Sequence, residues 1–370
     1  MSVVVFMLPH LKAMQTQFTL QVMANTRETD LLQQRGLDIS LDCAPVEREI
    51  RPLADLKALW WLYKRFRIEQ PAAVHTLTPK AGLLGMTAAW LAKVPLRVHT
   101  FTGQVWVTRQ GPMRWLLKVA DQCIATLATD VLVDSPSQRE FLITEGVVSA
   151  SRSSVLGAGS ICGVDTQRFV PNLAVRKIVR GELGASDDAL VCLYLGRLNR
   201  DKGVLDLAAA FAQVAINNPK AELWIVGPDE DELFGQMQNL LFAVSHKIKR
   251  VGYTNKPERF MQAADLFCLP SYREGFGSSV IEAAACGVPA LASRIYGLTD
   301  AVVEGQTGWL HKAGDVEDLT VKLTSLLLDK TELMNKGINA RNNAINLFEQ
   351  VKITAEMNHF YEKKLKQLKL

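Results

Sequence analysis

The sequence predicts an α/β protein built from two Rossmann-like, doubly wound domains that face a central cleft. Short apolar runs alternate with helix-like patterns through most of the 370 residues, and this alternation is typical of parallel sheets covered by helices. One glycine-rich stretch without helical periodicity interrupts the alternation near the middle of the chain. The length also suits two domains better than one.

The composition is that of a globular protein with a large core, since 48% of the residues are hydrophobic and 22% are charged. No apolar run reaches the roughly 20 residues that span a bilayer, and the start has no signal-peptide pattern. None of the six cysteines forms a CxxC pair. We therefore expect a cytoplasmic chain with reduced thiols and no metal site. The net charge of +4 is too small to indicate a nucleic-acid partner.

The N-terminal domain is assigned to residues 1–160. Such a domain ordinarily opens with a strand, and residues 2–8 fit one, but Ser2 is also a good N-cap and the helical pattern continues. We favour a first helix over residues 2–14, kinked at Pro9, with the usual first strand absent. Apolar runs then predict strands at 18–25, 38–43, 72–77, 96–101 and 130–135, separated by helices at 55–68, 80–92, 112–128 and 137–146.

The glycine-rich stretch at 157–172 is the predicted linker, and residues 173–348 form the second domain. A last helix, in residues 349–370, is expected to pack back on the first domain. Buried strands are predicted at 190–196, 222–227, 248–253, 264–270 and 289–293, and helical patterns at 315–328, 330–346 and 349–367.

The loop after the strand at 264–270 has the composition of an anion and sugar site. It reads SYREGFG, so Glu274 follows a strand end, where ligands of parallel sheets bind. Gly275 and Gly277 allow close backbone approach. Either Ser278 or Ser279 is predicted to cap the following helix, which ends at Gly287 and Pro289 and whose first N–H groups can hold phosphate.

Two further features complete this pattern. Glu282 lies one turn inside the helix, where a carboxylate can accept hydrogen bonds from the vicinal hydroxyls of a ribose. After the strand at 190–196, the loop GRLNRDKG carries Arg197 and Lys202, and two cations before a helix suit a diphosphate. The combination predicts a binding site for a nucleotide-sugar.

GRLNRDKG, EGFGSSVIE and YGLTDAVVEGQTGWL resemble the signature of glycosyltransferase family 4, whose members are retaining enzymes of GT-B architecture. Upstream, HTLTPKAGLLG, VPLRVHTFTGQVW and VLVDSPSQREFLI resemble bacterial O-antigen and capsular polysaccharide transferases. The resemblance implies a retaining, metal-independent hexosyltransferase without a cofactor. Such an enzyme moves a sugar from a nucleoside-diphosphate sugar to a lipid-linked saccharide. A UDP-sugar is the expected donor.

The resemblance also implies roles for individual residues. Arg197 and Lys202 hold the diphosphate, Glu282 the ribose, and Glu274 with the backbone of Phe276 and Gly277 the sugar hydroxyls. Gly252 and Tyr253 lie by the base, and His99 faces the donor sugar. Thr78 and Lys80 are candidates on the acceptor side. The catalytic group is predicted to be Arg197, Lys202, Glu274 and His99. The family's Gly-Gly-x-x-Glu segment is replaced by residues 296–300, YGLTD.

Several alternatives stay open. The acidic triplet at 229–231 can be a metal-binding DxD or the start of a helix, and we favour the helix start. Lys80 can meet an acceptor phosphate or merely cap the surface, and His75 fits a structural histidine better than a functional one. The whole chain can instead be a nucleotide-sugar 2-epimerase, a phosphorylase or a non-catalytic scaffold. An epimerase converts free donor without acceptor, and a scaffold binds donor without turnover.

Tryptophans alternate with basic residues in LWWLYKRFR and VWVTRQGPMRWLLK of the first half. Some of these aromatic side chains must belong to the core. Basic and aromatic residues together also suit an anionic membrane surface. We therefore expect peripheral association with the inner face of the plasma membrane, where a lipid-linked acceptor lies.

Overall fold

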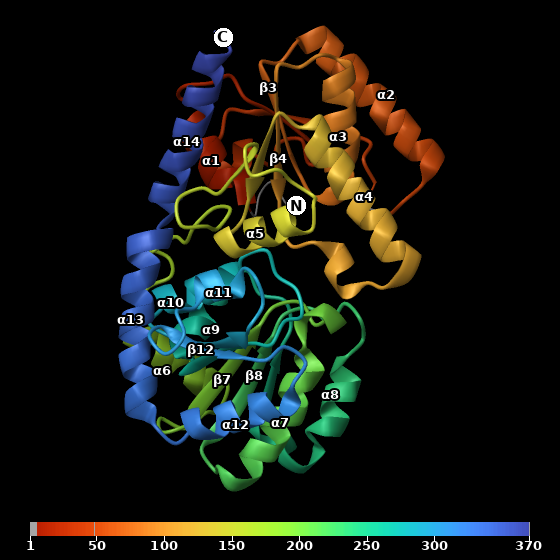
Figure 1. Cartoon of the computed structure of the whole chain (residues 1–370). Helices are drawn as coiled ribbons and strands as arrows, with labels where there is room; N and C mark the ends of the chain where they lie inside the picture. The colour runs from red at the N-terminus through yellow and green to blue at the C-terminus, as the bar shows by residue number, and fades with distance from the viewer. Residues whose placement is uncertain (1–5, 48, 370) are drawn as a thin grey trace. The chain divides into compact units, whose positions relative to one another are not determined.

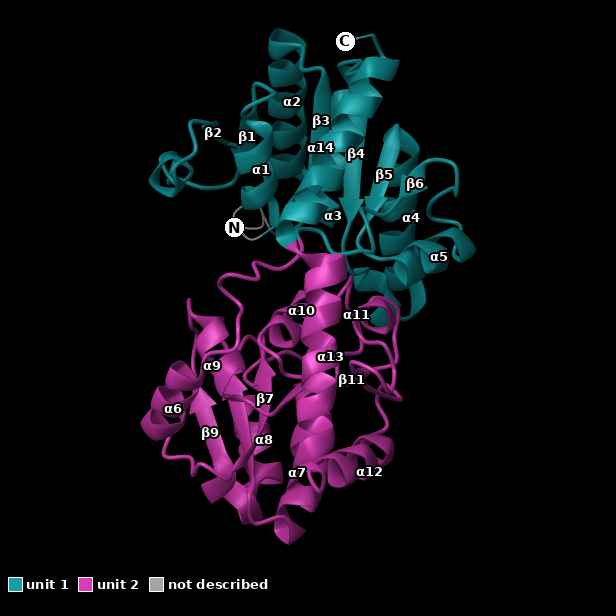
Figure 2. Cartoon of the chain, turned by 90° about the vertical axis from the view of Figure 1, so that its left-hand side faces the viewer, with its two compact units in different colours: residues 1–162, 350–370 teal, residues 163–349 magenta. Residues whose placement is uncertain are grey.

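The computed structural model describes residues 6–47 and 49–369, which form two compact units. Unit 1 contains residues up to Cys162 together with Gln350 onward, and unit 2 contains Gly163–Glu349 (Figure 2). The boundary at 162 and 163 lies inside the predicted linker. Figure 1 labels the helices and some of the strands of both units.

Unit 1 holds a four-stranded parallel sheet in the order β3-β4-β5-β6 and a separate parallel pair, β1-β2. The strands are β1 (Gln21–Ala24), β2 (Ser40–Cys43), β3 (Ala73–Leu77), β4 (Leu96–Phe101), β5 (Asp130–Val133) and β6 (Ser153–Ser154). The helices are α1 (Leu8–Met14), α2 (Pro52–Glu69), α3 (Pro79–Leu91), α4 (Gly111–Leu127), α5 (Pro136–Thr144) and α14 (Gln350–Gln367).

Both faces of the unit 1 sheet are covered by other elements. Successive side chains along each strand point to opposite faces, so each strand contributes to two clusters of the core. On β5, Val131 and Val133 pack against α2, α3 and α4, which lie side by side (Figure 1), while Leu132 packs on the other side. That second cluster contains Leu11 of α1 and Met357 of α14. The C-terminal helix is thus part of the core of unit 1.

The described start of the chain is helical, as predicted. Helix α1 begins at Leu8, with Pro9 in its first turn, and residues 6 and 7 before it form a π-helical turn; the kink at Pro9 stays a prediction. Proline fits a first turn because its missing N–H has no partner there anyway. Among the described residues none before Leu8 forms a strand. The predicted helical positions 2–5 lie outside the described residues.

Unit 2 holds a six-stranded parallel sheet in the order β12-β11-β10-β7-β8-β9. Its strands are β7 (Leu190–Leu195), β8 (Ala221–Val226), β9 (Ile248–Val251), β10 (Leu266–Leu269), β11 (Ala290–Ser293) and β12 (Gly308–His311). The sequence analysis missed β12 and β6. β12 is short and begins at a glycine, which the fold needs because a Cβ at Gly308 would lie 2.4 Å from the Ala290 carbonyl oxygen.

Two groups of helices pack in unit 2. α7 (Val204–Asn217) packs with α8 (Phe234–Leu240) and α12 (Val316–Leu326). The other group contains α6 (Leu173–Glu182), α9 (Pro257–Ala263), α10 (Ser278–Ala285), the short α11 (Leu298–Ala301) and α13 (Lys330–Phe348). This is the doubly wound arrangement that the sequence predicts for the second domain.

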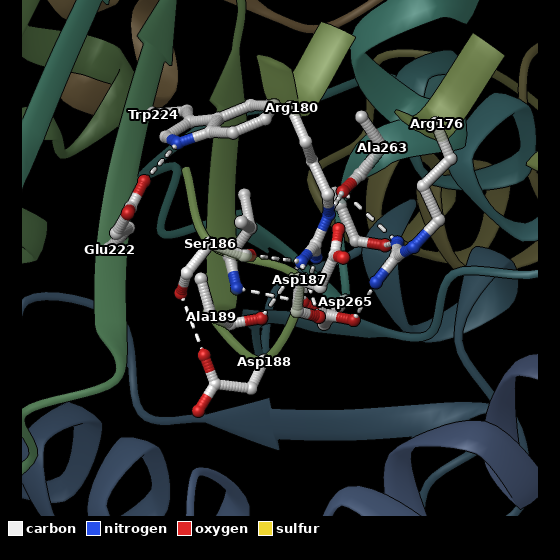
Figure 3. Close-up of polar contacts among 12 residues, drawn as sticks. Arg176, Arg180, Ser186, Asp187, Asp188, Ala189, Glu222, Trp224, Ala263 and Asp265 are labelled. Atoms are coloured by element: carbon white, nitrogen blue, oxygen red, sulfur yellow. Dashed lines mark hydrogen bonds and ion pairs between the residues drawn. The ribbon is translucent and has the colours of Figure 1, made fainter. Parts of the chain in front are cut away.

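A buried charged cluster joins α6 to the amino ends of β7 and β10 (Figure 3). The carboxylate of Asp265 accepts hydrogen bonds from Arg176 at 2.5 Å, Arg180 at 2.6 Å and the backbone N–H of Val191 at 2.8 Å. Arg180 is only 2% exposed and also donates to the carbonyl oxygens of Ala263 and others. Every charge in the cluster therefore has a partner, as burial requires.

Candidate functional site

The candidate site in unit 2 lies where the strand order reverses. β7 and β10 are neighbours at the centre of the sheet, but β7 is followed along the chain by β8 on one side and β10 by β11 on the other. The loops after these two strands diverge, and ligands of doubly wound sheets bind at such a switch point. Arg197 and Lys202 come from the first loop and Glu274 from the second.

These two loops are joined by polar contacts. Lys202 Nζ lies 2.5 Å from Glu274 Oε1, and the same carboxylate accepts a hydrogen bond from Ser271 Oγ at 2.8 Å. Both side chains of the ion pair are less than one-fifth exposed. Arg273 also pairs with Asp201 at 2.7 Å. Two predicted ligand groups from opposite sides of the switch point are therefore held in one place.

The loops also touch through their backbones. Gly203 begins α7 with φ +63°, and a Cβ there would lie 2.0 Å from the carbonyl oxygen of Pro270. Only glycine can adopt this conformation at this distance without displacing the second loop. The last glycine of GRLNRDKG thus allows Lys202 to reach Glu274.

Arg197 is held by the loop after β8. Its Nη1 lies 2.9 Å from Glu230 Oε2, and its side chain is half exposed. The neighbouring acids have structural partners, because Asp229 accepts hydrogen bonds from the N–H groups at the start of α8, and Asp231 accepts one from Arg200. The described residues contain no group of three His, Cys, Asp or Glu side chains that could hold a metal. The contacts of the acidic triplet are thus with the start of α8 and with the loop that carries Arg197.

Helix α10 starts differently from the prediction. Its N-cap is Gly277, with φ +82°, and no side chain caps it, so neither Ser278 nor Ser279 has the predicted capping role. The two serines lie within the first turn. Phe276 is buried and packs edge-on against Phe348, 5.0 Å between ring centroids. Only the backbone of Phe276 is thus free for a ligand.

Glu282 lies one turn into α10 and is partly buried. The pKa of its carboxyl is raised to about 7, chiefly by burial, which the charge of Arg168 opposes and the charge of Glu258 supports. The glutamate is therefore partly protonated near neutral pH in the unliganded chain, and both forms can accept hydrogen bonds from hydroxyls.

We expect Glu282 to make unit 2 less stable as the pH rises. Its folded pKa lies above the ordinary 4.5, so the folded state binds this proton more tightly, and the free energy of unfolding falls from about pH 4.5 to about pH 7. Glu282→Gln should then be more stable than the parent by about 1–3 kcal/mol at pH 8 and little different at pH 4.5. Urea unfolding at both pH values measures this. An equal difference at both would contradict it.

In unit 1, His99 lies within β4, which ends at Phe101 as the sequence predicts. Its side chain is 1% exposed, and Nδ1 lies 2.8 Å from Thr76 Oγ1. Burial lowers the pKa of His99 to about 3. His99 is thus neutral, and its role toward a donor sugar stays a prediction.

The other candidates of unit 1 have partners. Lys80 forms an ion pair with Asp55 at 2.5 Å, and Thr78 precedes the first turn of α3. His75 is hydrogen-bonded at both ring nitrogens, to Tyr361 and Thr100, as suits a structural histidine. The acceptor roles of Thr78 and Lys80 stay predictions.

A small polar pocket lies at the carboxyl ends of β3 and β4, and it contains residues that the sequence analysis missed. Thr78 and His99 line it together with Gln104 and Asp121. Asp121 accepts a hydrogen bond from Trp106 Nε1 at 2.8 Å, and burial raises the pKa of its carboxyl to about 6. A lone acid among the apolar residues of helix α4 is the one signal in the sequence that marks this position.

Comparison with known proteins identifies the family. The model of the glycosyl transferases group 1 matches residues 175–343, and that of the glycosyl transferase 4-like domain matches residues 7–159. The capsular polysaccharide biosynthesis glycosyltransferase CapM of Staphylococcus aureus is 30% identical over 324 residues, which cover 87% of this chain and 85% of CapM. The chain belongs to glycosyltransferase family 4.

Two further proteins are similar to this glycosyltransferase. An Escherichia coli enzyme named UDP-Gal:alpha-D-GlcNAc-diphosphoundecaprenol alpha-1,3-galactosyltransferase is 30% identical over 321 residues, 85% of this chain and 81% of that enzyme. The crystal structure of Anabaena HepE in complex with UDP and glucose has a TM-score of 0.81 at 19% identity, covering 97% of this chain and 95% of HepE. The likeness confirms the predicted GT-B fold.

In the YGLTD segment of the glycosyltransferase, the structure explains why residue 297 is a glycine. Gly297 has φ +81°, and a Cβ on it would lie 2.3 Å from the carbonyl oxygen of Gly275. The segment thus packs directly against the EGFG loop. Asp300 lies in the first turn of the short helix that follows.

Proposed function

We propose that this glycosyltransferase is a retaining enzyme of bacterial surface polysaccharide biosynthesis. It takes a sugar from a nucleoside-diphosphate sugar, UDP being the expected carrier, and transfers it to a lipid-linked saccharide. The observation that carries the proposal is the Lys202–Glu274 pair at the switch point of unit 2. It sets a cation for phosphate beside a carboxylate for sugar hydroxyls.

The enzyme must stabilise the charges that develop on the donor in the transition state. The leaving diphosphate gains negative charge, which Arg197, Lys202 and the N–H groups at the start of α10 stabilise without a metal. Glu274 holds the sugar hydroxyls while the anomeric carbon becomes positively charged. The acceptor oxygen attacks from the face that the diphosphate leaves, and a phosphate oxygen takes the acceptor proton. The new glycosidic bond then keeps the configuration of the donor.

The comparisons support the substrate classes but not the particular sugar. HepE has been crystallised with UDP and glucose, and the E. coli relative carries UDP-galactose and a diphosphoundecaprenol-linked sugar in its name. By analogy we assign a UDP-sugar donor and a lipid-linked acceptor to this chain.

A panel of UDP-, GDP- and dTDP-sugars tests the proposal. Binding is measured by calorimetry and nucleotide release is followed with EDTA present. We expect one donor to bind and to release nucleotide slowly. A chain that converts the free donor into another nucleotide-sugar is an epimerase, and one that binds without turnover in the presence of lipid extracts is a scaffold. Nucleotide release that stops with EDTA contradicts the metal-independent mechanism.

We also assign peripheral membrane association to unit 1. Within residues 6–47 and 49–369, none of the helices has the length and hydrophobicity of a membrane span. Helices α2 and α4, which both pack against α3, expose Trp60 and Trp115, together with Leu53, Leu56, Met113 and Leu116, and basic Lys57, Lys64 and Arg67 are also exposed on α2. Apolar side chains beside cations suit an anionic lipid surface.

We expect the double variant Trp60→Ser/Trp115→Ser to lose most of its binding to vesicles that contain phosphatidylglycerol, as measured by co-sedimentation. The control is Phe242→Ser, which removes an even more exposed aromatic side chain from unit 2 and should bind as the parent does. Equal binding of all three proteins would contradict the assignment.

A further inference from the structure

The last residues of β7 contain a buried phenol beneath the Arg197 loop. Tyr194 is fully buried, and its hydroxyl donates a hydrogen bond of 2.7 Å to the carbonyl oxygen of Arg197. Burial, reinforced by the charge of Glu274, raises the pKa of Tyr194 far above its usual range. The phenol is therefore a permanent donor to the backbone of the loop.

The space around this contact is closed. A Cβ on Gly196 would lie 3.2 Å from the Tyr194 hydroxyl, and a Cβ on Gly227 would lie 2.0 Å from the carbonyl oxygen of Gly196. The loops after β7 and β8 also pair, because Leu198 N–H donates to Pro228 and Glu230 N–H donates to Leu198. The main chain around Arg197 is therefore held by two groups, the Tyr194 hydroxyl and the backbone of the loop after β8.

The side chain of Arg197 has a separate support. Glu230 contacts Nη1 alone, through both carboxylate oxygens at 2.9 and 3.3 Å. Because the guanidinium has five N–H groups, most remain available to a ligand. The direction in which they point depends on where the main chain of Arg197 lies, and Tyr194 holds that main chain through the hydrogen bond to the Arg197 carbonyl oxygen.

We propose that Tyr194 is a positioning residue of the diphosphate site, which sets the Arg197 loop for binding through its hydrogen bond to the Arg197 carbonyl. The proposal rests on the proposed function, since it takes Arg197 as a ligand of the donor diphosphate. Tyr194 itself does not touch the donor. A positioning group of this kind acts on phosphate affinity and not on the nucleoside part of the ligand.

The test compares UDP with uridine, which lacks phosphate, in the parent and in Tyr194→Phe. The substitution removes only the hydroxyl and leaves the Arg197 carbonyl without its donor. We expect the Kd of UDP to rise about tenfold, with the affinity for uridine unchanged. Unchanged uridine affinity also shows that the variant is folded.

The matched control is Tyr361→Phe. Tyr361 is also buried, and its hydroxyl lies 2.8 Å from His75 Nδ1 in unit 1, so this variant loses a comparable hydrogen bond away from the Arg197 loop. Its affinity for UDP should stay that of the parent. If Tyr194→Phe binds UDP as the parent does, or loses UDP and uridine affinity equally, the inference is wrong. If the parent binds none of the nucleoside diphosphates, the proposed function itself fails.

Discussion

We expect Lys202→Ala to lower the rate constant of nucleotide release from the bound donor by about 10²–10³-fold, with a smaller loss of donor affinity. The diphosphate is more negative in the transition state than in the ground state, so a cation beside it stabilises the transition state more. The substitution also leaves Glu274, whose side chain is 13% exposed, without its counter-ion. Steady-state and single-turnover assays with the donor found in the panel separate the two effects.

Substitution of Glu274, the ion-pair partner of Lys202, tests the same site from its other side. Glu274→Gln keeps the size of the side chain but removes its charge, so it should weaken the sugar contact and leave Lys202 without its carboxylate partner. The control is Lys220→Ala, which breaks an exposed ion pair with Asp188 and should leave the rate unchanged. If Lys202→Ala keeps its rate within about threefold, Lys202 does not stabilise the leaving group.

The second large effect concerns stability, and it comes from Asp265. Removing this carboxylate leaves the buried guanidinium of Arg180 without its counter-ion and the N–H of Val191 without an acceptor. Loss of one partner from a buried ion pair costs about 3–5 kcal/mol, a large part of the 5–15 kcal/mol typical of folded proteins. We expect Asp265→Ala to lose this amount in urea unfolding followed by tryptophan fluorescence.

Two variants refine the measurement. Asp265→Asn keeps an acceptor for Val191 but loses the charge, so it should lie between the parent and Asp265→Ala. Asp188→Ala removes an exposed carboxylate near the same strand end and should leave stability unchanged. Because the cluster lies at the amino ends of β7 and β10, away from the loops that hold Lys202 and Glu274, folded Asp265→Ala should still bind UDP. An unaltered unfolding midpoint would show that the pairs contribute nothing.

The sequence predicted the parts of this molecule that depend on local chemistry. Glycines at 203 and 277 and the charged residues beside them mark loops after apolar strands, and a parallel sheet must bring such loops to one edge. The order of the strands was not predictable from one sequence, yet it decides which loops become neighbours. Lys202 and Glu274 are 72 residues apart, and only the switch point joins them.

The contacts that sequence analysis missed have a common origin. Glu230 looks like an ordinary surface acid in the sequence, and Asp265 is a single acid near the start of a predicted buried strand; the partners of both lie far away in the sequence. Tyr194 looks like a core residue in the sequence. The alternation of side chains along a strand predicts which face Tyr194 lies on, but not which group its hydroxyl contacts. The predicted serine cap failed because Gly277, in the left-handed conformation, already begins α10. Side-chain partners over long sequence separations need the fold first.

The route of the chain has a consequence for its synthesis on the ribosome. Unit 1 is begun first but its core lacks Ile353, Met357 and Tyr361 until α14 is made. At about 5–20 residues per second, the whole of unit 2 is translated during an interval of about 10–40 s. Throughout that time the apolar residues of α1, β1 and β2 lack the side chains of α14 that pack against them in the finished protein. We therefore expect chaperones to bind mainly to unit 1 of the nascent chain. A chain that terminates before α14 leaves the core of unit 1 incomplete.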